Sequence, residues 1–523
     1  MRRRVVATGG AVVLLLLAGC SDSGTPGADS GSVSGSGEPS QTAGPATTTV
    51  TVPTGPPPAA AAALGPTGPG TAKPCQGTAI PVGKDPQSVI DAAPQSTVFC
   101  FAKGVHRISR TIKPRTGDTL GGGAGVVLTG SVRLTGWKRS GNAWVVRGAL
   151  PAAYPLKGQC EDNQAKPCQR GEQVFVDGKH LTRVMRRSDL KPGTFFGDYA
   201  ADAVYVGDDP DGHQVELSRT QTAIDKSADN VTVTGLTIEH FASRAQGGAL
   251  QVGRGWKVTG NEVRWNHAVG IMVIEGDGAT LSRNTVADNG QLGIGQYKSA
   301  GVRITANLVT RNNTDGFWIA DWESGGIKST RSSGEVSGND IVANRGVGMW
   351  SDIAEYDRRI TGNRIRDNAA DGIRYEISYQ AVIDQNVVEN NGFGTGRGSG
   401  GSLWDGGGIN VNTSADVQVR GNLVKDNRNG ISIQSRTRGD GPRGTYVLTG
   451  VVIEGNTVVM ADATATTGVV ENKGSPTKPG AVTFRRNSYQ IAGSPANRFA
   501  FRGRPMTWSQ WQQAGFDQDS VTG

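Results

Sequence analysis

The most constraining feature of this sequence is a short asparagine motif that recurs between Trp256 and Gln434. Each copy has one Asn, a second Asn five residues later, and then a Gly followed by an apolar residue. The pairs are Asn261/Asn266, Asn284/Asn289, Asn307/Asn312, Asn339/Asn344, Asn363/Asn368, Asn386/Asn391 and Asn422/Asn427. Where no insertion intervenes, successive first asparagines are 23 or 24 residues apart. Such a period predicts a solenoid, in which every unit buries the next.

The repeated asparagines and glycines have a structural explanation. Asn tolerates tight turns and can hydrogen-bond to its equivalent in the adjacent coil, so we expect asparagine ladders. The Gly before each main strand is expected to allow a corner conformation that other residues resist. These glycines are Gly270, Gly293, Gly316, Gly348, Gly372, Gly408 and Gly430. Neither set is expected to carry chemistry.

Composition agrees with a solenoid of many turns. Gly is abundant, at 77 residues, whereas charged residues make up 19% and aromatic residues 6% of the chain. This composition disfavours a helical bundle. The net charge of +8 is mild and scattered, which is compatible with an acidic glycan or an anionic surface. It does not form the basic stripe typical of nucleic-acid binding, so no nucleic-acid partner is expected.

The first 20 residues have the pattern of a signal peptide. Arg2–Arg4 form a basic region, Ala11–Ala18 an apolar region, and Leu-Ala-Gly-Cys ends it at Cys20. The apolar run is too short for a transmembrane helix, which needs about 20 residues. The ending resembles the lipobox of bacterial lipoproteins. That resemblance implies lipidation of Cys20 and anchoring on the extracellular face of the bacterial cell membrane.

Residues 21–74 are rich in Gly, Ser, Thr, Pro and Ala and have no apolar periodicity. Such a segment cannot bury enough surface to offset chain entropy, so it is predicted to be a disordered tether.

Four cysteines remain after Cys20, an even number that indicates disulfides in an exported protein. Proximity in the sequence favours Cys75–Cys100 and Cys160–Cys168 among three possible connectivities. No His or further Cys is spaced for a metal, so a zinc site is not expected.

A short helix and a strand are predicted just before the first coils. Asp85 suits a helix N-cap and Pro86 the first helical position, the helix ends near Ala93, and a strand follows at Ser96–Phe101. This segment resembles the N-terminal cap of right-handed parallel β-helix proteins of the pectate-lyase-like superfamily. The resemblance extends over roughly Lys84–Phe484 and implies an all-β, right-handed parallel β-helix with a helical cap.

The coil period is interrupted once. Strands with the hairpin turns Asp177-Gly178 and Asp211-Gly212 replace it, which predicts a β-rich module inserted in the solenoid. The predicted division is 75–136 for the cap and first coils, 137–220 for the inserted module, 221–484 for the main β-helix and 485–523 for a C-terminal cap.

Alternation along each main strand sets a predicted register. The first and third residues after the Gly are mostly apolar and should face the core, so the second and fourth should face solvent. On this register Tyr297, Trp318 and Trp350 are exposed neighbours. An exposed aromatic floor of this kind suits the flat faces of sugar rings.

Asp352 and Glu376 take the same outward position in consecutive coils, with backbones about 4.8 Å apart. Like charges directly opposite one another are destabilising, so their presence indicates a function. The insertion at Asp321–Ser333 brings Glu323 and Lys328 beside them. A second insertion, Gly392–Gly407, is expected to form the opposite wall of a groove.

Three functions remain open at this point. Paired carboxylates are the usual equipment for glycoside hydrolysis, and repulsion between Asp352 and Glu376 would raise the proton affinity of one of them. This leading hypothesis is a monomeric enzyme that cleaves a polysaccharide without a cofactor or metal.

The resemblance to polysaccharide lyases of the superfamily implies an alternative, a uronate lyase or C5-epimerase. Lys328 or Arg374 would then be the base, and Asp352 and Glu376 would hold Ca²⁺. The third possibility is a non-catalytic glycan-binding envelope protein, in which the charged residues form a solvated ion-pair cluster.

Overall fold

The computed structural model describes residues 63–151, 160–161, 167–320, 322–394, 405–471, 475–494 and 496–523. The predicted signal peptide, Cys20 and most of the predicted tether lie outside these residues. Within the described residues, no helix is long and apolar enough to cross a membrane.

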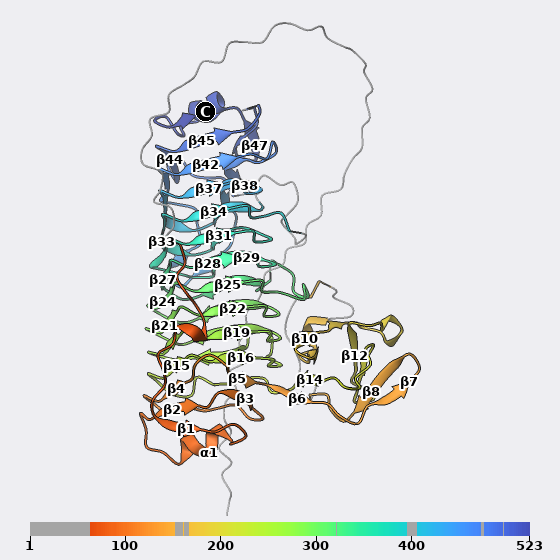
Figure 1. Cartoon of the computed structure of the whole chain (residues 1–523). Helices are drawn as coiled ribbons and strands as arrows, with labels where there is room; N and C mark the ends of the chain where they lie inside the picture. The colour runs from red at the N-terminus through yellow and green to blue at the C-terminus, as the bar shows by residue number, and fades with distance from the viewer. Residues whose placement is uncertain are drawn as a thin grey trace, which may run out of the picture. The chain divides into compact units, whose positions relative to one another are not determined.

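Three long sheets, here called sheets A, B and C, form a parallel β-helix, as predicted (Figure 1). The chain passes through them in turn, one strand per sheet in each coil. Sheet A contains β1 (Thr78–Ile80), β2 (Val98–Phe101), β4 (Thr119–Gly121), β15 (Thr232–Thr234), β18 (Lys257–Thr259), β21 (Thr280–Ser282), β24 (Val302–Thr305), β27 (Gly334–Ser337), β30 (Arg358–Thr361), β33 (Tyr379–Asp384), β36 (Ala415–Arg420), β41 (Val451–Glu454) and β44 (Val482–Arg485).

Sheet B contains β3 (Gly104–Arg107), β5 (Val126–Thr129), β16 (Thr237–Glu239), β19 (Glu262–Arg264), β22 (Thr285–Ala287), β25 (Leu308–Thr310), β28 (Asp340–Val342), β31 (Arg364–Arg366), β34 (Val387–Glu389), β37 (Leu423–Lys425), β42 (Thr457–Met460), β45 (Ser488–Ile491) and β48 (Val521–Thr522). Sheet C contains β17 (Gly248–Val252), β20 (Val269–Ile274), β23 (Leu292–Tyr297), β26 (Gly325–Thr330), β29 (Val347–Asp352), β32 (Ile373–Glu376), β35 (Gly407–Asn412), β38 (Asn429–Ser435), β43 (Thr467–Glu471), β46 (Phe499–Phe501) and β47 (Arg504–Met506).

The inward side chains of the three sheets form one continuous apolar core. In sheet C it includes Ile271, Ile294, Ile327, Met349 and Ile373, which align on neighbouring strands. Each residue is almost completely excluded from water. A strand buried on its inner face in every coil explains why the apolar residues recur at fixed positions of the repeat.

The asparagines form two hydrogen-bonded ladders, as predicted. The Nδ2 and backbone N of Asn307, for example, both donate to Oδ1 of Asn339 in the next coil, at 3.0 and 2.9 Å. The first ladder continues through Asn456 to Asn487, beyond the repeats recognised in the sequence. At its C-terminal end, Asn487 Nδ2 donates to Asp517 Oδ1 at 2.9 Å.

The predicted reason for the repeated glycines is wrong at most positions. Gly293, for instance, does not have a positive φ. A Cβ at this residue would instead lie 2.5 Å from Val309 Cγ1 and 2.7 Å from Asn312 Nδ2. Glycine is therefore required because the strand passes close to the asparagine ladder, and not because of an unusual backbone conformation.

The inserted module has two small sheets. One contains β6 (Ser131–Arg133), β9 (Val174–Val176), β10 (Lys179–His180) and β14 (Val215–Ser218). The other contains β7 (Lys138–Ser140), β8 (Ala143–Arg147), β11 (Thr182–Arg183), β12 (Thr194–Asp198) and β13 (Ala203–Val206), and short 3-10 helices η2 (Pro167–Gln169) and η3 (Arg187–Asp189) lie between strands. The carbonyl of Gly130 accepts hydrogen bonds from the amides of Arg219 and Thr220. The module therefore begins at β6, six residues before the predicted boundary.

Both predicted caps are present. Helix α1 (Pro86–Asp91) buries Ile90 in the core, although the Asp85 side chain makes no capping hydrogen bond. At the other end, helix α2 (Trp508–Gln513) buries Trp511. The last coil extends through β46, so the solenoid ends about 17 residues after the predicted Phe484.

The end of the predicted tether is ordered. Residues 65–73, including the 3-10 helix η1 (Pro69–Thr71), run along the coils (Figure 1). The Gly68 amide donates to the Arg283 carbonyl at 2.9 Å, and Thr67 Oγ1 lies 2.7 Å from Thr285 Oγ1. These contacts show that a Gly/Pro-rich segment can be held by backbone hydrogen bonds without apolar periodicity.

Candidate active site

The outer face of sheet C carries the predicted site, and the register is confirmed where the carboxylates lie. Trp350 pairs with Arg374 and Ser351 with Tyr375 across β29 and β32. Asp352 and Glu376 are the next residues of these strands. The predicted position of the two carboxylates on consecutive coils is therefore correct.

The predicted register is wrong in the coil that precedes β29. Gly326, and not Gly316, is the Gly before the apolar residue that aligns with Met349, so Lys328 takes the position assigned to Trp318. Lys328 lies between Gly295 on β23 and Trp350 on β29. The error arose because Gly followed by an apolar residue occurs twice in this coil, and the insertion lies before the strand.

Trp318 therefore lies away from the sheet C ladder. Its side chain is 1% exposed and belongs to a buried cluster with Cys160 and Cys168. These cysteines form a disulfide, as do Cys75 and Cys100, which confirms both predicted pairings. Trp318 cannot offer an exposed face to a sugar ring.

The predicted exposed aromatic floor is not formed. Trp350 and Tyr297 are 5% and 8% exposed. The Nζ of Lys328 lies 3.3 Å from the centroid of the Trp350 ring, and the Arg374 guanidinium carbon lies 4.9 Å from it. The indole therefore stabilises two cations, an interaction worth about 2 kcal/mol when desolvated.

Lys328 links Asp352 to the insertion that precedes β26. Its Nζ lies 2.8 Å from Asp352 Oδ2 and 3.0 Å from Glu323 Oε1. Burial lowers the pKa of Lys328, but the two carboxylates outweigh burial and raise this pKa above its usual value. The ammonium group is therefore protonated at neutral pH. The predicted grouping of Glu323, Lys328 and Asp352 is correct.

Glu376 is held from the following coils. Its Oε1 accepts hydrogen bonds from Asn412 Nδ2 and Arg438 Nη1, each at 2.8 Å. Arg438 precedes the hairpin of β39 (Asp440–Gly441) and β40 (Gly444–Thr445). This residue was missed in the sequence, although the 34-residue interval between Asn422 and Asn456 marks an insertion there.

Arg374 belongs to a second ion pair. Its Nε donates to Asp371 Oδ2 at 2.6 Å, and Asp371 Oδ1 accepts from the Gly407 amide at 2.7 Å. Gly407 ends the second predicted insertion, of which residues 395–404 lie outside the described residues. The predicted opposite wall of the groove therefore stays a prediction.

Each carboxylate keeps one oxygen for other chemistry. In the part of the chain that the structure describes, Asp352 Oδ1 and Glu376 Oε2 accept no hydrogen bond, whereas Asp352 Oδ2 and Glu376 Oε1 make the close contacts with Lys328 and Arg438. Both side chains are 9% exposed. Repulsion between them, expected from the sequence, is offset because each carboxylate contacts its own cation.

The arrangement does not fit Ca²⁺. Among the described residues, no group of three or more His, Cys, Asp or Glu side chains is placed to hold a metal ion. Lys328 and Arg438 contact the carboxylate oxygens where a cation would bind. Divalent cations need several free oxygen ligands, so we derive no step that uses one.

Comparisons with known proteins agree on the fold. Residues 247–408 match the family model described as "Right handed beta helix region". The structure of XylC in complex with xylose has a TM-score of 0.62 and 15% sequence identity, over 84% of this chain and 82% of XylC. A search of the curated proteins found no match.

Two further solved structures are more distant. The catalytic unit of a GH87 α-1,3-glucanase from Streptomyces thermodiastaticus has a TM-score of 0.46 and 12% identity, over 87% of this chain and 70% of that one. The A-module of the Azotobacter vinelandii mannuronan C-5 epimerase AlgE6 has a TM-score of 0.40 and 13% identity, over 84% and 94%. With TM-scores below 0.5, these two likenesses say nothing further about this chain.

Proposed function

We propose that this protein is a carbohydrate-active enzyme that cleaves a glycosidic bond in a polysaccharide, with Asp352 and Glu376 as the reacting pair. One observation carries the proposal. The two carboxylates lie at equivalent positions of adjacent strands, and each is held by a cation through one oxygen while the other oxygen accepts no hydrogen bond in the described chain. Hydrolysis of a glycoside needs two carboxyl groups on either side of one bond.

In this mechanism one carboxyl group gives a proton to the leaving oxygen, and the other assists attack at the anomeric carbon. Lys328 and Arg438 hold the two groups in fixed orientations and balance their charge. Keeping these charges largely out of water is costly, and a solenoid can stack without them. Clusters of this kind are typical of functional sites.

The lyase and epimerase alternative is less well supported by the side chains. A general base must be free to accept a proton. Lys328 is held as an ammonium group by two carboxylates, and Arg374 donates to Asp371. Neither is placed as an unprotonated base.

The proposal keeps the predicted anchoring of a monomer at the extracellular face of the membrane through Cys20. A Cys20→Ser variant tests it, because the protein should then leave the membrane fraction. If Cys20→Ser stays in that fraction without detergent, lipidation of Cys20 does not anchor the chain.

Products released from a panel of neutral and acidic glycans test the activity. A hydrolase releases reducing ends, whereas a lyase releases an unsaturated sugar that absorbs in the ultraviolet, and a binding protein releases nothing. Asp352→Asn and Glu376→Gln should each lower kcat by about 100-fold or more. Glu389→Gln is the control, because this carboxylate lies on sheet B and pairs only with Arg364 in the described chain. Wild-type turnover by both site variants would show that the pair is misassigned.

A further inference from the structure

The insertion that carries Glu323 is held by contacts within itself. Asn313 Nδ2 donates to the Trp318 carbonyl at 2.9 Å, and the Trp318 amide donates to Asn313 Oδ1 at 3.3 Å. Ser324 Oγ donates to the Ile319 carbonyl at 3.0 Å. The indoles of Trp318 and Trp322 stack with centroids 5.6 Å apart. Glu323 directly follows this stack.

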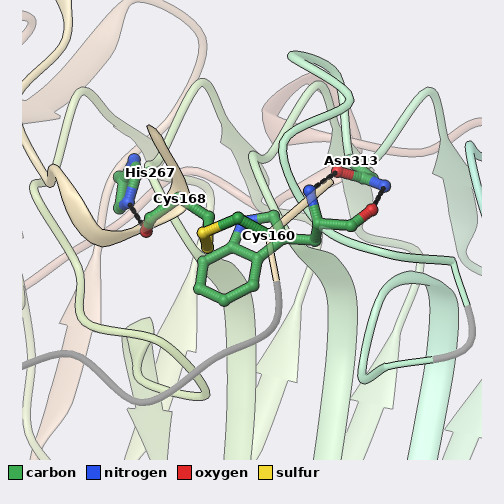
Figure 2. Close-up of a disulfide and its surroundings, with 5 residues drawn as sticks. Cys160, Cys168, His267 and Asn313 are labelled. Atoms are coloured by element: carbon green, nitrogen blue, oxygen red, sulfur yellow. Dashed lines mark hydrogen bonds between the residues drawn. A yellow bond between two sulfur atoms is a disulfide. The ribbon is translucent and has the colours of Figure 1, made fainter. Parts of the chain in front are cut away.

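The same insertion is joined to the inserted module by backbone pairing beside the Cys160–Cys168 disulfide, whose two cysteines both belong to the module (Figure 2). Cys160 forms an antiparallel bridge with Trp318, and the Glu161 amide donates to the Phe317 carbonyl at 2.8 Å. On the other side, the Cys168 carbonyl lies 2.9 Å from His267 Nε2, which belongs to the solenoid. Cys160, Cys168 and Trp318 are each buried to 99% or more.

These contacts form one continuous path to the candidate site. The disulfide ties residues 160–161, which pair with Trp318, to the coil that carries His267. Trp318 stacks on Trp322, and the next residue, Glu323, contacts Lys328 at 3.0 Å. Lys328 in turn contacts Asp352 at 2.8 Å.

We propose that the Cys160–Cys168 disulfide, acting through Trp318 and Trp322, positions Glu323 against Lys328 and so maintains the charge arrangement around Asp352. The inserted module then supports the site, although in the contacts described above none of its residues touches Asp352 or Glu376. The inference builds on the proposed function only in taking this cluster as the site. Its tests need no substrate, so the positioning role of the disulfide and the proposed glycosidic cleavage can each be refuted without the other.

The decisive variant is Cys160→Ala/Cys168→Ala, compared with Cys75→Ala/Cys100→Ala, which removes the other disulfide at the N-terminal cap. Hydrogen exchange should become at least about tenfold faster at the amides of Trp318 and Trp322 in the first variant only. The pKa of Lys328, followed by NMR with labelled lysine and assigned with Lys328→Arg, should fall in that variant. Burial of the ammonium group persists while the Glu323 carboxylate moves away.

Trp318→Ala keeps both disulfides and should reproduce these two changes, whereas Trp318→Phe, which retains a buried ring, should largely restore the wild-type values. If the cysteine variant does not fold, as judged by circular dichroism, the Trp318 pair carries the test. Unchanged exchange at Trp322 and an unchanged Lys328 pKa, in either the cysteine variant or Trp318→Ala, would overturn the proposal. Equal changes in the Cys75→Ala/Cys100→Ala control would overturn it too, because the effect would then be general loosening.

Discussion

Replacement of Asn307 by Ala tests how strongly the asparagine ladder holds the stack. The Nδ2 of Asn307 donates to the Leu281 carbonyl, the Thr305 carbonyl and Asn339 Oδ1, at 3.0, 3.1 and 3.0 Å. Its Oδ1 accepts from the backbone N and the Nδ2 of Asn284, each at 2.9 Å. One alanine therefore removes five hydrogen bonds in a fully buried position.

The expected cost follows from what each partner retains. Asn284 Nδ2 still donates to the Val258 carbonyl, and Asn339 Oδ1 still accepts from the backbone N of residue 307. The backbone N–H of Asn284 loses its acceptor, Asn307 Oδ1, and a buried unpaired donor costs about 1–3 kcal/mol. The lost hydrogen bonds to the Leu281 and Thr305 carbonyls add about 1 kcal/mol each. Asn307→Ala should therefore lower the free energy of unfolding by about 3–5 kcal/mol.

Urea unfolding followed by circular dichroism measures this loss, and hydrogen exchange at the Asn284 amide shows whether it is local. Asn142→Ala is the control, because Asn142 is exposed in the turn between β7 and β8, has no positive φ and makes no side-chain hydrogen bond within the described residues. We expect less than about 1 kcal/mol for that control. A cost below about 1 kcal/mol for Asn307→Ala, with unchanged exchange at Asn284, would refute the reasoning.

Two further predictions concern buried charge in and beside the core. Glu355 and Arg358 are ion-paired and almost fully buried, so Arg358→Met should lower the free energy of unfolding in urea by about 3–5 kcal/mol. The control Arg359→Met changes the outward-facing neighbour and should lower it by under about 1 kcal/mol. Equal losses in the two variants would contradict this prediction. Burial lowers the pKa of His267 to about 4, and the charge of Arg183 adds to this shift. The contact with the Cys168 carbonyl and the charges of Asp315 and Glu172 oppose it. Because the unfolded chain takes up this proton near pH 6.5 and the folded chain does not, the stability should fall by up to about 3 kcal/mol between pH 6.5 and pH 4. In His267→Asn the slope of urea midpoint against pH should be smaller, and an unchanged slope would show that His267 does not cause it.

Sequence periodicity was sufficient to predict the fold because every coil of the solenoid repeats the same local interactions. The Asn pairs and the alternation after each Gly mark where every strand lies, so the positions of Asp352 and Glu376 could be predicted. Periodicity gives the wrong strand position where an insertion contains the same Gly–apolar pair as the repeat. Gly316-Phe317 imitates Gly326-Ile327, and only the strand pairing of Lys328 with Trp350 separates them.

The burial of the site could not be predicted from the repeat either. An outward position in a strand is exposed only if nothing else covers it, and covering segments come from insertions that have no period. Arg438 reaches Glu376 from such a segment. Lys328 covers Trp350 in a different way, since a long side chain on the neighbouring strand can fold across an indole.

The direction of the asparagine ladder has an electrostatic consequence. In the first ladder each side-chain amide donates to the Asn of the next coil toward the C-terminal end, from Asn261 through Asn456 to Asn487, and its oxygen accepts from the coil before. The amide dipoles therefore add along one line, as peptide dipoles do in an α-helix, and leave partial positive charge at the last donor. Asp517 accepts from Asn487 at that point, and from Tyr489 and Trp511 as well. A buried carboxylate thus ends the line of dipoles, which makes the C-terminal cap an electrostatic terminus as well as a cover for the core.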